Sequence, residues 1–201
     1  MEISDPKAIR ALAHPVRLDL LDLLVATGPA TAAQCGRLLG LPQANCSFHL
    51  RQLAKYGFVE DAGPGNDRRE RRWQVPRTRL RFRGAGAAEC DLQQVVIQRA
   101  MQAIADFGDR QATEPEDWRN AAAIVSGTAL VTAAEAAELK EQWKSLLAPY
   151  LARAVGSGPS NKPAERYVRY FMAGTPLAPP WRGQTSEISH HKQRTTDDPA
   201  R

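Results

Sequence analysis

Two short helical segments separated by a very tight turn constrain this sequence more than any other feature. The first segment begins with Thr31 and Gln34, the spacing of a capping box, and stops at Gly40, where helices often end in a left-handed residue. After only two residues a second helix begins, and it runs to Gly57. Its apolar stripe is formed by Cys46, Leu50 and Leu53. Two short helices joined by so short a turn are typical of a helix-turn-helix.

Two further helices are predicted before this unit, and a hairpin is predicted after it. An Asp-Pro pair can start a helix over residues 5–13, and a His-Pro pair separates it from a second helix over residues 16–26. Residues 58–60 and 71–75 are predicted strands, with a Gly-Pro-rich turn between them. The order of these elements predicts a winged helix-turn-helix, in which the hairpin is the wing.

The positive charge of the chain is concentrated in the part that carries this unit. Residues 1–83 hold 14 Lys and Arg against 8 Asp and Glu, whereas residues 84–201 hold 13 against 14. A basic module followed by a nearly neutral one indicates a polyanionic partner for the first part only. Charge runs are often just solvated faces, so double-stranded DNA is predicted from the order of the elements together with the charge.

The helix after the tight turn begins with the polar side chains that a helix in the DNA major groove needs. Gln and Asn can pair with adenine, Ala can approach a thymine methyl group, and Ser and Arg can reach bases or phosphates. Arginines on the wing can reach phosphates or the minor groove. The predicted DNA contacts are Gln43, Ala44, Asn45, Ser47, Phe48, Arg51, Arg68, Arg69, Arg71 and Arg72.

Four short segments carry a further signal: ALAHPVRL at 11–18, LGL at 39–41, SFHLRQL at 47–53 and GFV at 57–59. With these segments, residues 11–75 resemble the winged helix-turn-helix of ArsR-type bacterial transcriptional regulators. The resemblance covers about a third of the chain. It implies a homodimer that binds a palindromic operator, usually as a repressor that a signal releases.

The sequence departs from that family at two places. The family usually has Ser where Pro42 stands, so the usual side-chain cap of the recognition helix is missing. Metal-sensing members carry a Cys-x-Cys-type pair in the third helix, where this chain has only Cys35. Cys35 and Cys46 fall on predicted core stripes, and Cys90 stands alone. No metal site and no cofactor is therefore predicted, and a metal-responsive repressor is kept as an alternative.

A long amphipathic helix is predicted from Glu89 to Phe107. It can pair with its counterpart in a second chain about a two-fold axis, or it can pack beneath its own wing domain. The predicted dimerisation residues are Leu92, Val95, Val96, Ile104 and Phe107.

The region beyond this helix is predicted to be a small α/β unit. Residues 121–131 and 167–172 are predicted strands that could pair, and residues 132–155 form an amphipathic helix that Pro149 could kink or end. The aromatic residues of this region can line an apolar pocket for a small-molecule effector, or they can form a core.

The predicted fold class is α+β and mostly helical: a winged helix-turn-helix, a long dimerisation helix and a small α/β C-terminal region. The predicted divisions are a DNA-binding domain over 1–84, a dimerisation and effector-binding region over 87–176, and a flexible tail over 177–201.

Several function classes receive no support from the sequence. No apolar run approaches the length of a membrane span, the first residues lack a signal-peptide pattern, and three scattered cysteines form no disulfide framework, so a cytoplasmic location is predicted. No catalytic motif or phosphate-binding loop is present, so no enzyme is predicted. The predicted function is a DNA-binding transcriptional regulator, and a winged helix that binds protein is a further alternative.

Overall fold

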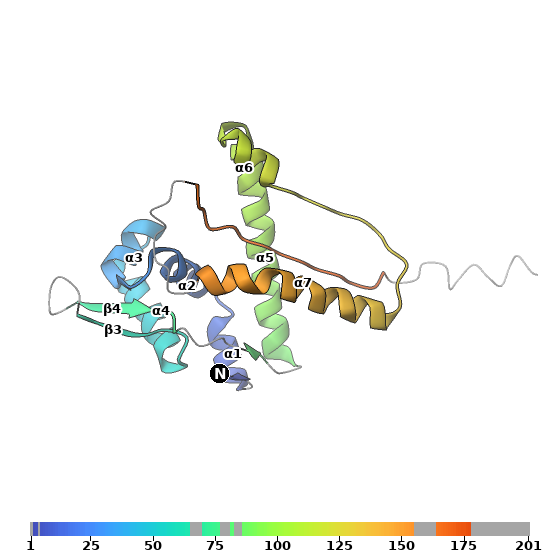
Figure 1. Cartoon of the computed structure of the whole chain (residues 1–201). Helices are drawn as coiled ribbons and strands as arrows, with labels where there is room; N and C mark the ends of the chain where they lie inside the picture. Colours follow the sequence, from blue (N-terminus) through green and yellow to red (C-terminus); the bar gives the residue numbers. More distant parts are fainter. Residues whose placement is uncertain are drawn as a thin grey trace, which may run out of the picture. The chain divides into compact units, whose positions relative to one another are not determined.

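The computed structural model describes residues 2–3, 5–64, 70–76, 81–82, 86–154 and 164–177. The chain divides into a unit of residues 1–169 and a C-terminal unit of residues 170–201. The elements of the first unit, of which Figure 1 labels the helices α1 to α7 and the strands β3 and β4, are β1 (Glu2–Ile3), α1 (Pro6–Leu12), α2 (Pro15–Thr27), β2 (Ala30–Thr31), α3 (Ala32–Leu39), α4 (Gln43–Lys55), β3 (Glu60–Pro64), β4 (Arg71–Gln74), β5 (Arg81–Phe82), α5 (Ala87–Arg110), the 3₁₀ turn η1 (Gln111–Thr113), α6 (Glu116–Ala121) and α7 (Ala133–Ala154).

The helix starts follow from local capping chemistry. The Asp5 carboxylate accepts a hydrogen bond from the backbone N–H of Lys7 at 2.9 Å, and a proline occupies the first turn of α1. At α3 the Thr31 hydroxyl accepts from the Gln34 N–H at 3.2 Å, and the Gln34 side chain accepts from the Thr31 N–H at 2.8 Å. Both starts confirm the sequence prediction, because each depends only on residues within one turn.

A three-stranded antiparallel sheet of order β2-β4-β3 forms the wing and its base. Trp73 of β4 lies opposite Ala30 on one side and Asp61 on the other. The hairpin of β3 and β4 confirms the predicted wing, but β3 lies at Glu60–Pro64 and not at 58–60, so it includes residues that were predicted as turn. The strand β2 was not predicted, because two residues carry no strand pattern. The two-residue strands β1 and β5 pair in parallel.

The hydrophobic core lies almost entirely within α1 to β4. Its largest fully buried side chains are those of Leu20, Leu50, Leu53, Phe58 and Val59. Trp73 covers the core on the side of the sheet, and Ala88 and Leu92 of α5 also pack against the core. The structure therefore confirms a mostly helical fold with a small antiparallel sheet. Among the described helices, none is long and apolar enough to cross a membrane.

One side of α5 belongs to this core and the other is open. Leu92 packs against the core, while Val95 and Phe107 are half-buried. The predicted residues Val96 and Ile104 are exposed, as are Ile97 and Met101 next to them. The predicted apolar stripe is thus divided between packing beneath the wing domain and an uncovered face.

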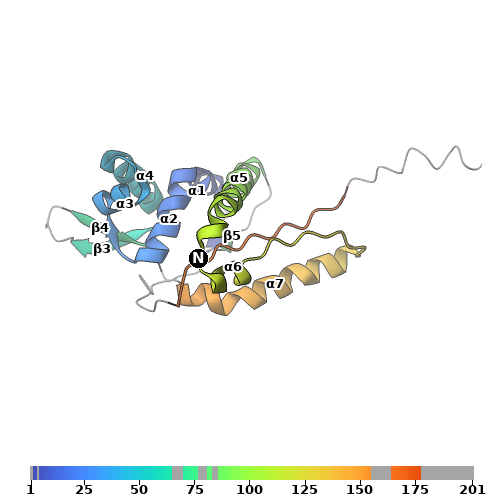
Figure 2. The same ribbon diagram turned by 90° about the horizontal axis from the view of Figure 1, so that it is seen from above.

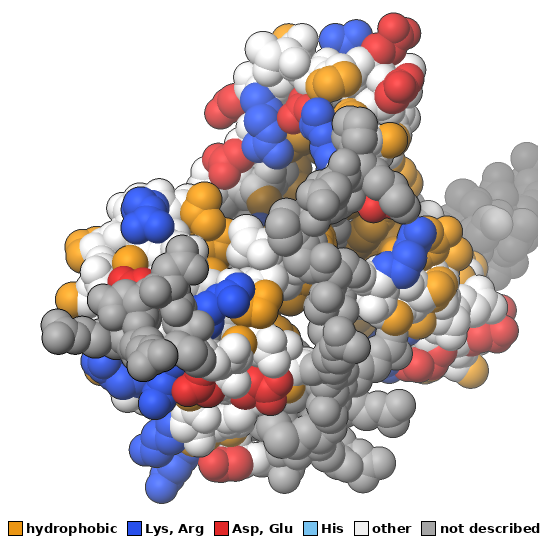
Figure 3. Space-filling view, turned by 60° about the vertical axis from the view of Figure 1, so that its left-hand side comes forward, with side chains coloured by type: hydrophobic (Ala, Val, Ile, Leu, Met, Phe, Trp, Pro, Cys, Tyr) orange, Lys and Arg blue, Asp and Glu red, His pale blue; other side chains and the backbone are white. Residues whose placement is uncertain are grey.

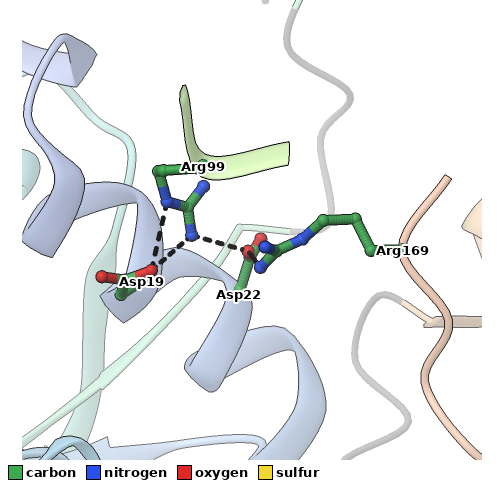
Figure 4. A network of polar contacts seen from close by, with 4 residues as sticks. All are labelled: Asp19, Asp22, Arg99 and Arg169. Atoms are coloured by element: carbon green, nitrogen blue, oxygen red, sulfur yellow. Dashed lines mark hydrogen bonds and ion pairs between the residues drawn. The ribbon is translucent and has the colours of Figure 1, made fainter. Parts of the chain in front are cut away.

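A polar network fastens the middle of α5 to α2 (Figure 4). Arg99, whose side chain is only 15% exposed, donates from Nε to Asp19 Oδ1 at 3.1 Å and from Nη2 to Asp22 Oδ2 at 3.0 Å. Arg169, from the extended segment after α7, pairs with the same Asp22 carboxylate at 2.6 Å. The network joins the middle of α5 to α2, and Arg169 joins it through Asp22.

The strands predicted beyond α5 were wrong. Residues 122–132 and 165–177 form neither helix nor strand, and Leu130 is fully exposed at 103%. The β-prone runs find no partner strand in the described chain, and without pairing a strand pattern has no structure to stabilise. Tyr150 and Tyr167 are also exposed, at 55% and 43%, so neither belongs to a buried core. Pro149 does not end the helix early, because α7 continues through it to Ala154.

Candidate nucleic-acid interface

The turn between α3 and α4 is held by the backbone of Gly36. Its carbonyl accepts hydrogen bonds from the N–H of Gly40 and, at 2.9 Å, from the N–H of Leu41. A Cβ atom on Gly36 would lie 2.6 Å from the Leu41 carbonyl oxygen, so only glycine fits there. Gly40 has φ of +66°, the left-handed cap that the sequence predicted. These two glycines fix the angle at which α4 leaves the turn.

The start of α4 has no side-chain cap. Pro42 occupies the cap position, and its carbonyl accepts from the N–H groups of Asn45 at 3.0 Å and Cys46 at 3.2 Å. The backbone of Pro42 therefore begins the helix at the position where ArsR-type regulators, which residues 11–75 resemble, usually have a serine. The first turn of α4 also contains no acidic residue that would repel a phosphate.

The two sides of α4 differ in chemistry. Cys46, His49, Leu50 and Leu53 are buried against the rest of the domain. Gln43, Ala44, Phe48 and Arg51 are exposed, and Asn45 and Ser47 are half-buried. Arg51 donates from Nη1 to the Ser47 hydroxyl at 2.9 Å, which holds the guanidinium along the helix. The structure therefore places the six predicted residues of α4 on one short helix, and four of these six side chains are exposed to solvent.

The arginines of the wing that the structure describes also have partners within the domain. Arg71 Nε pairs with Asp61 Oδ2 of β3 at 2.9 Å, and its guanidinium lies 5.3 Å from the centre of the Trp73 ring. Arg72 Nη2 donates to the Pro29 carbonyl at 2.9 Å and so ties β4 to the segment before β2. Arg71 remains 61% exposed. The predicted contacts Arg68 and Arg69 lie outside the described residues.

Sequence reasoning missed two exposed side chains on α3. Arg37 lies in the last turn of this helix, and Leu38 beside it is 61% exposed. In helix-turn-helix proteins the first helix of the pair crosses the DNA backbone, so Arg37 belongs with the candidate phosphate contacts. An exposed Arg at the C-terminal end of α3 could have been found from the helical pattern. Figure 3, which turns this side of the molecule forward, shows Lys and Arg along its lower left edge beside a smaller acidic group.

A buried histidine pair lies behind α4. The rings of His14, which precedes α2, and His49 of α4 have centroids 4.5 Å apart. Their Nδ1 atoms, together with Nε of Arg17, are buried without a hydrogen-bond partner. Burial lowers the pKa of both histidines, and the positive charge of Arg17 lowers both further. The pair therefore favours the neutral form and joins the start of α2 to α4.

The two buried cysteines are core residues, as predicted. Cys35 and Cys46 are fully buried, and burial raises the pKa of the Cys35 thiol to about 11. A thiol with so high a pKa stays protonated near neutral pH and is a poor metal ligand. Within the described residues, no group of three His, Cys, Asp or Glu side chains could hold a metal ion.

Comparison with known proteins gives distant structural likenesses. No protein of curated function matches the sequence. Solved structures that resemble the chain include a mutant of ZitR from Lactococcus lactis, at 12% identity and a TM-score of 0.31, covering 68% of this chain and 73% of that one. Another is the transcriptional regulator Tm0710 from Thermotoga maritima, at 14% identity and a TM-score of 0.29, covering 69% of this chain and 79% of that one. These values are too low to carry any property of those proteins to this chain.

The family comparison is specific to the region described above. Residues 12–62, from the end of α1 to β3, match the family model of a helix-turn-helix domain. That stretch contains the Gly36–Gly40 turn and all of α4. Residues 12–62 therefore match a helix-turn-helix domain, in agreement with the arrangement of α3 and α4 described above.

Proposed function

We propose that this protein is a sequence-specific transcriptional regulator that reads duplex DNA through α4. The observation that carries the proposal is the open face of α4, where Gln43, Ala44 and Arg51 stand free of the core. Amide and guanidinium groups make the two-point contacts that distinguish adenine and guanine in the major groove. The Gly36 turn holds this helix at a fixed angle, as sequence readout requires.

Phosphate contacts come from the elements that flank α4. Arg37 at the end of α3 and Arg71 on the wing are exposed, so both can reach the DNA backbone. Arg71 can do so while it keeps its stacking contact with Trp73. Arg68 and Arg69, predicted from the sequence, would extend the same contact at the wing.

The protein acts, in this proposal, as a homodimeric repressor on a palindromic operator. The uncovered face of α5 supports dimerisation, because Val96, Ile97, Met101 and Ile104 lie on one side of a 24-residue helix. An exposed apolar stripe of this kind marks a protein interface more often than a free surface. Repression itself follows only from the resemblance of residues 11–75 to ArsR-type regulators.

Selection of bound duplexes from random DNA tests sequence readout. The full chain should enrich one sequence, and its affinity for that duplex should fall steeply with salt, with a log–log slope of ~0.9 for each neutralised phosphate. Gln43→Ala should weaken binding and relax one base position, whereas Gln94→Ala, on an exposed site of α5, should change nothing. Failure to enrich any sequence, or an affinity that is flat against salt, would contradict the proposal.

Sedimentation of the full chain tests dimerisation. The wild type should sediment as a dimer, and the double variant Ile97→Glu, Ile104→Glu should sediment as a monomer with an unchanged circular dichroism spectrum. The matched control is Gln98→Glu, Gln102→Glu, which adds the same two charges at exposed polar positions of the same helix and should stay dimeric. A wild-type monomer, or an Ile97, Ile104 variant that stays dimeric, would exclude this face of α5.

A further inference from the structure

Phe48 is the one large apolar side chain on the open face of α4. It is 52% exposed, although the other large apolar residues of this helix are buried. A phenylalanine left half in water forgoes much of the free energy that burial would give. In the described part of the chain, about half of the Phe48 surface stays in contact with solvent. We therefore look for the contact that buries it on a binding partner.

The buried His49 ring limits the orientations that the Phe48 ring can take. The ring meets that of His49 edge-on at 5.2 Å, and His49 is itself buried against His14. The Phe48 side chain is therefore supported from behind by the core, while its outer side faces solvent. An apolar group that is already oriented loses little conformational entropy when it binds.

The position of Phe48 places it among residues that would meet base edges. Ala44 precedes it by one helical turn, about 6 Å along the axis, and Arg51 follows it by three residues. Ala44 and Phe48 thus form a short apolar strip on the open side of α4, with Gln43 and Arg51 as polar neighbours. In the DNA major groove, the apolar group that distinguishes one base from the others is the 5-methyl group of thymine.

We infer that Phe48 is a specificity-determining residue that packs against the 5-methyl group of a thymine in the bound duplex. This inference rests on the proposed DNA-binding function and adds the base that one side chain selects. The contact buries the methyl group against the ring and needs no hydrogen bond, so it complements the amide and guanidinium contacts beside it. In a palindromic site the same contact would occur once in each half.

Deoxyuridine substitution isolates this contact, because it removes the methyl group and leaves base pairing unchanged. The probe is the duplex that the full wild-type chain selects from random DNA, with each thymine replaced in turn by deoxyuridine. One thymine per half-site should be sensitive, with about a fourfold loss of wild-type affinity, the value expected for burying a single methyl group.

Phe48→Ala should bind the thymine duplex more weakly and should lose the discrimination between thymine and deoxyuridine at that position. Leu38→Ala is the matched control, because Leu38 is another exposed apolar residue of the same unit, on α3, and it should keep the fourfold ratio. Both side chains are exposed, so both variants should keep the thermal midpoint of the wild type.

The inference is overturned if Phe48→Ala keeps the wild-type ratio at every thymine, or if no thymine is sensitive while the duplex still binds specifically. If the wild-type chain binds no duplex specifically, that result would instead contradict the proposed DNA-binding function. A Phe48→Ala variant with unchanged DNA affinity and a lost protein partner would assign this ring to protein binding and would also overturn the inference.

Discussion

In the first half of this chain most large apolar side chains are buried, whereas in the second half many of them are exposed to solvent. From Ala8 to Trp73 the core is continuous, and of the large apolar residues described in this part only Leu38 and Phe48 are exposed. After Ala100 no described residue is buried. α5 shows the contrast within one helix, since Leu92 packs against the core and Met101 is open.

Figure 2 shows the two kinds of structure from above: helices α1 to α4 gather beside the hairpin, whereas a long extended segment joins α6 to α7. The difference teaches that the helix-turn-helix region encloses its hydrophobic core within a single chain. Among its described residues, the second half carries exposed apolar side chains and no buried core, and contiguous exposed apolar patches often mark binding surfaces.

The largest expected effect comes from opening the core behind α4. Leu50→Ala should lower the free energy of unfolding by about 2–5 kcal/mol, because Leu50 is fully buried and a cavity would remain. Leu38→Ala, on the exposed side of α3, should change it by less than about 0.5 kcal/mol. Urea unfolding of the full chain, followed by tryptophan fluorescence, measures both. Equal losses would mean that the first half is not the enclosed unit described above.

Substitution of one glycine in each half compares how tightly the backbone is packed there. Gly36→Ala should cost about 3 kcal/mol, because the new Cβ would collide with the Leu41 carbonyl and force the turn apart. Gly108→Ala, in α5, should stabilise the chain by about 0.5–1 kcal/mol, because nothing lies within 4 Å of its Cβ position. Thermal melting reports both shifts. Destabilisation by Gly108→Ala would indicate that this end of α5 meets a closely packed partner.

The junction between the halves should contribute less. Arg99→Met removes the charge that bridges Asp19 and Asp22 and should cost about 1–2 kcal/mol, reduced by the partial exposure of both carboxylates. Arg169→Met, whose pair with Asp22 is exposed on both sides, should cost less than about 0.5 kcal/mol. Chemical denaturation of the two variants tests this order, and the reverse order would contradict the role given to Arg99.

The smallest effect is a pH dependence at His14 and His49. Both have a pKa in the folded chain below the 6.5 of a free histidine, so folding favours their neutral forms. Their contribution to stability is complete above pH 6.5 and is lost as the pH falls through the lowered folded-state values. Asp19 opposes the shift at His14. The free energy of unfolding should fall as the pH is lowered below 6.5, and His49→Gln should flatten that slope. An unchanged slope would exclude the pair.

Local chemistry made much of the first half predictable from sequence. The Thr31–Gln34 capping box, the left-handed Gly40 and the two sides of α4 each depend on residues within a few positions. The role of Gly36 was not predictable, because it depends on the approach of Leu41 across the turn. The strand β2 was not predictable for a similar reason, since its two residues form a strand only by pairing with Trp73 and Arg72 of β4.

The second half was predicted less well because its partners lie elsewhere. A run of β-branched and apolar residues at 121–131 satisfies a strand pattern, yet a strand needs another strand, and none is present among the described residues. On α5 the helical period located the apolar positions correctly. It could not show that Leu92 faces the core while Ile104 does not.

The ratio of affinities for a selected and a scrambled duplex tests the central claim, that the open face of α4 reads DNA sequence. Both duplexes are measured with the full chain at one salt concentration. The wild type should prefer the selected duplex by about 10³-fold or more. The double variant Gln43→Ala, Arg51→Ala should bring the ratio close to one while it keeps the thermal midpoint and the weak binding to scrambled DNA. A wild-type ratio near one, or a double variant that keeps the preference, would contradict the claim.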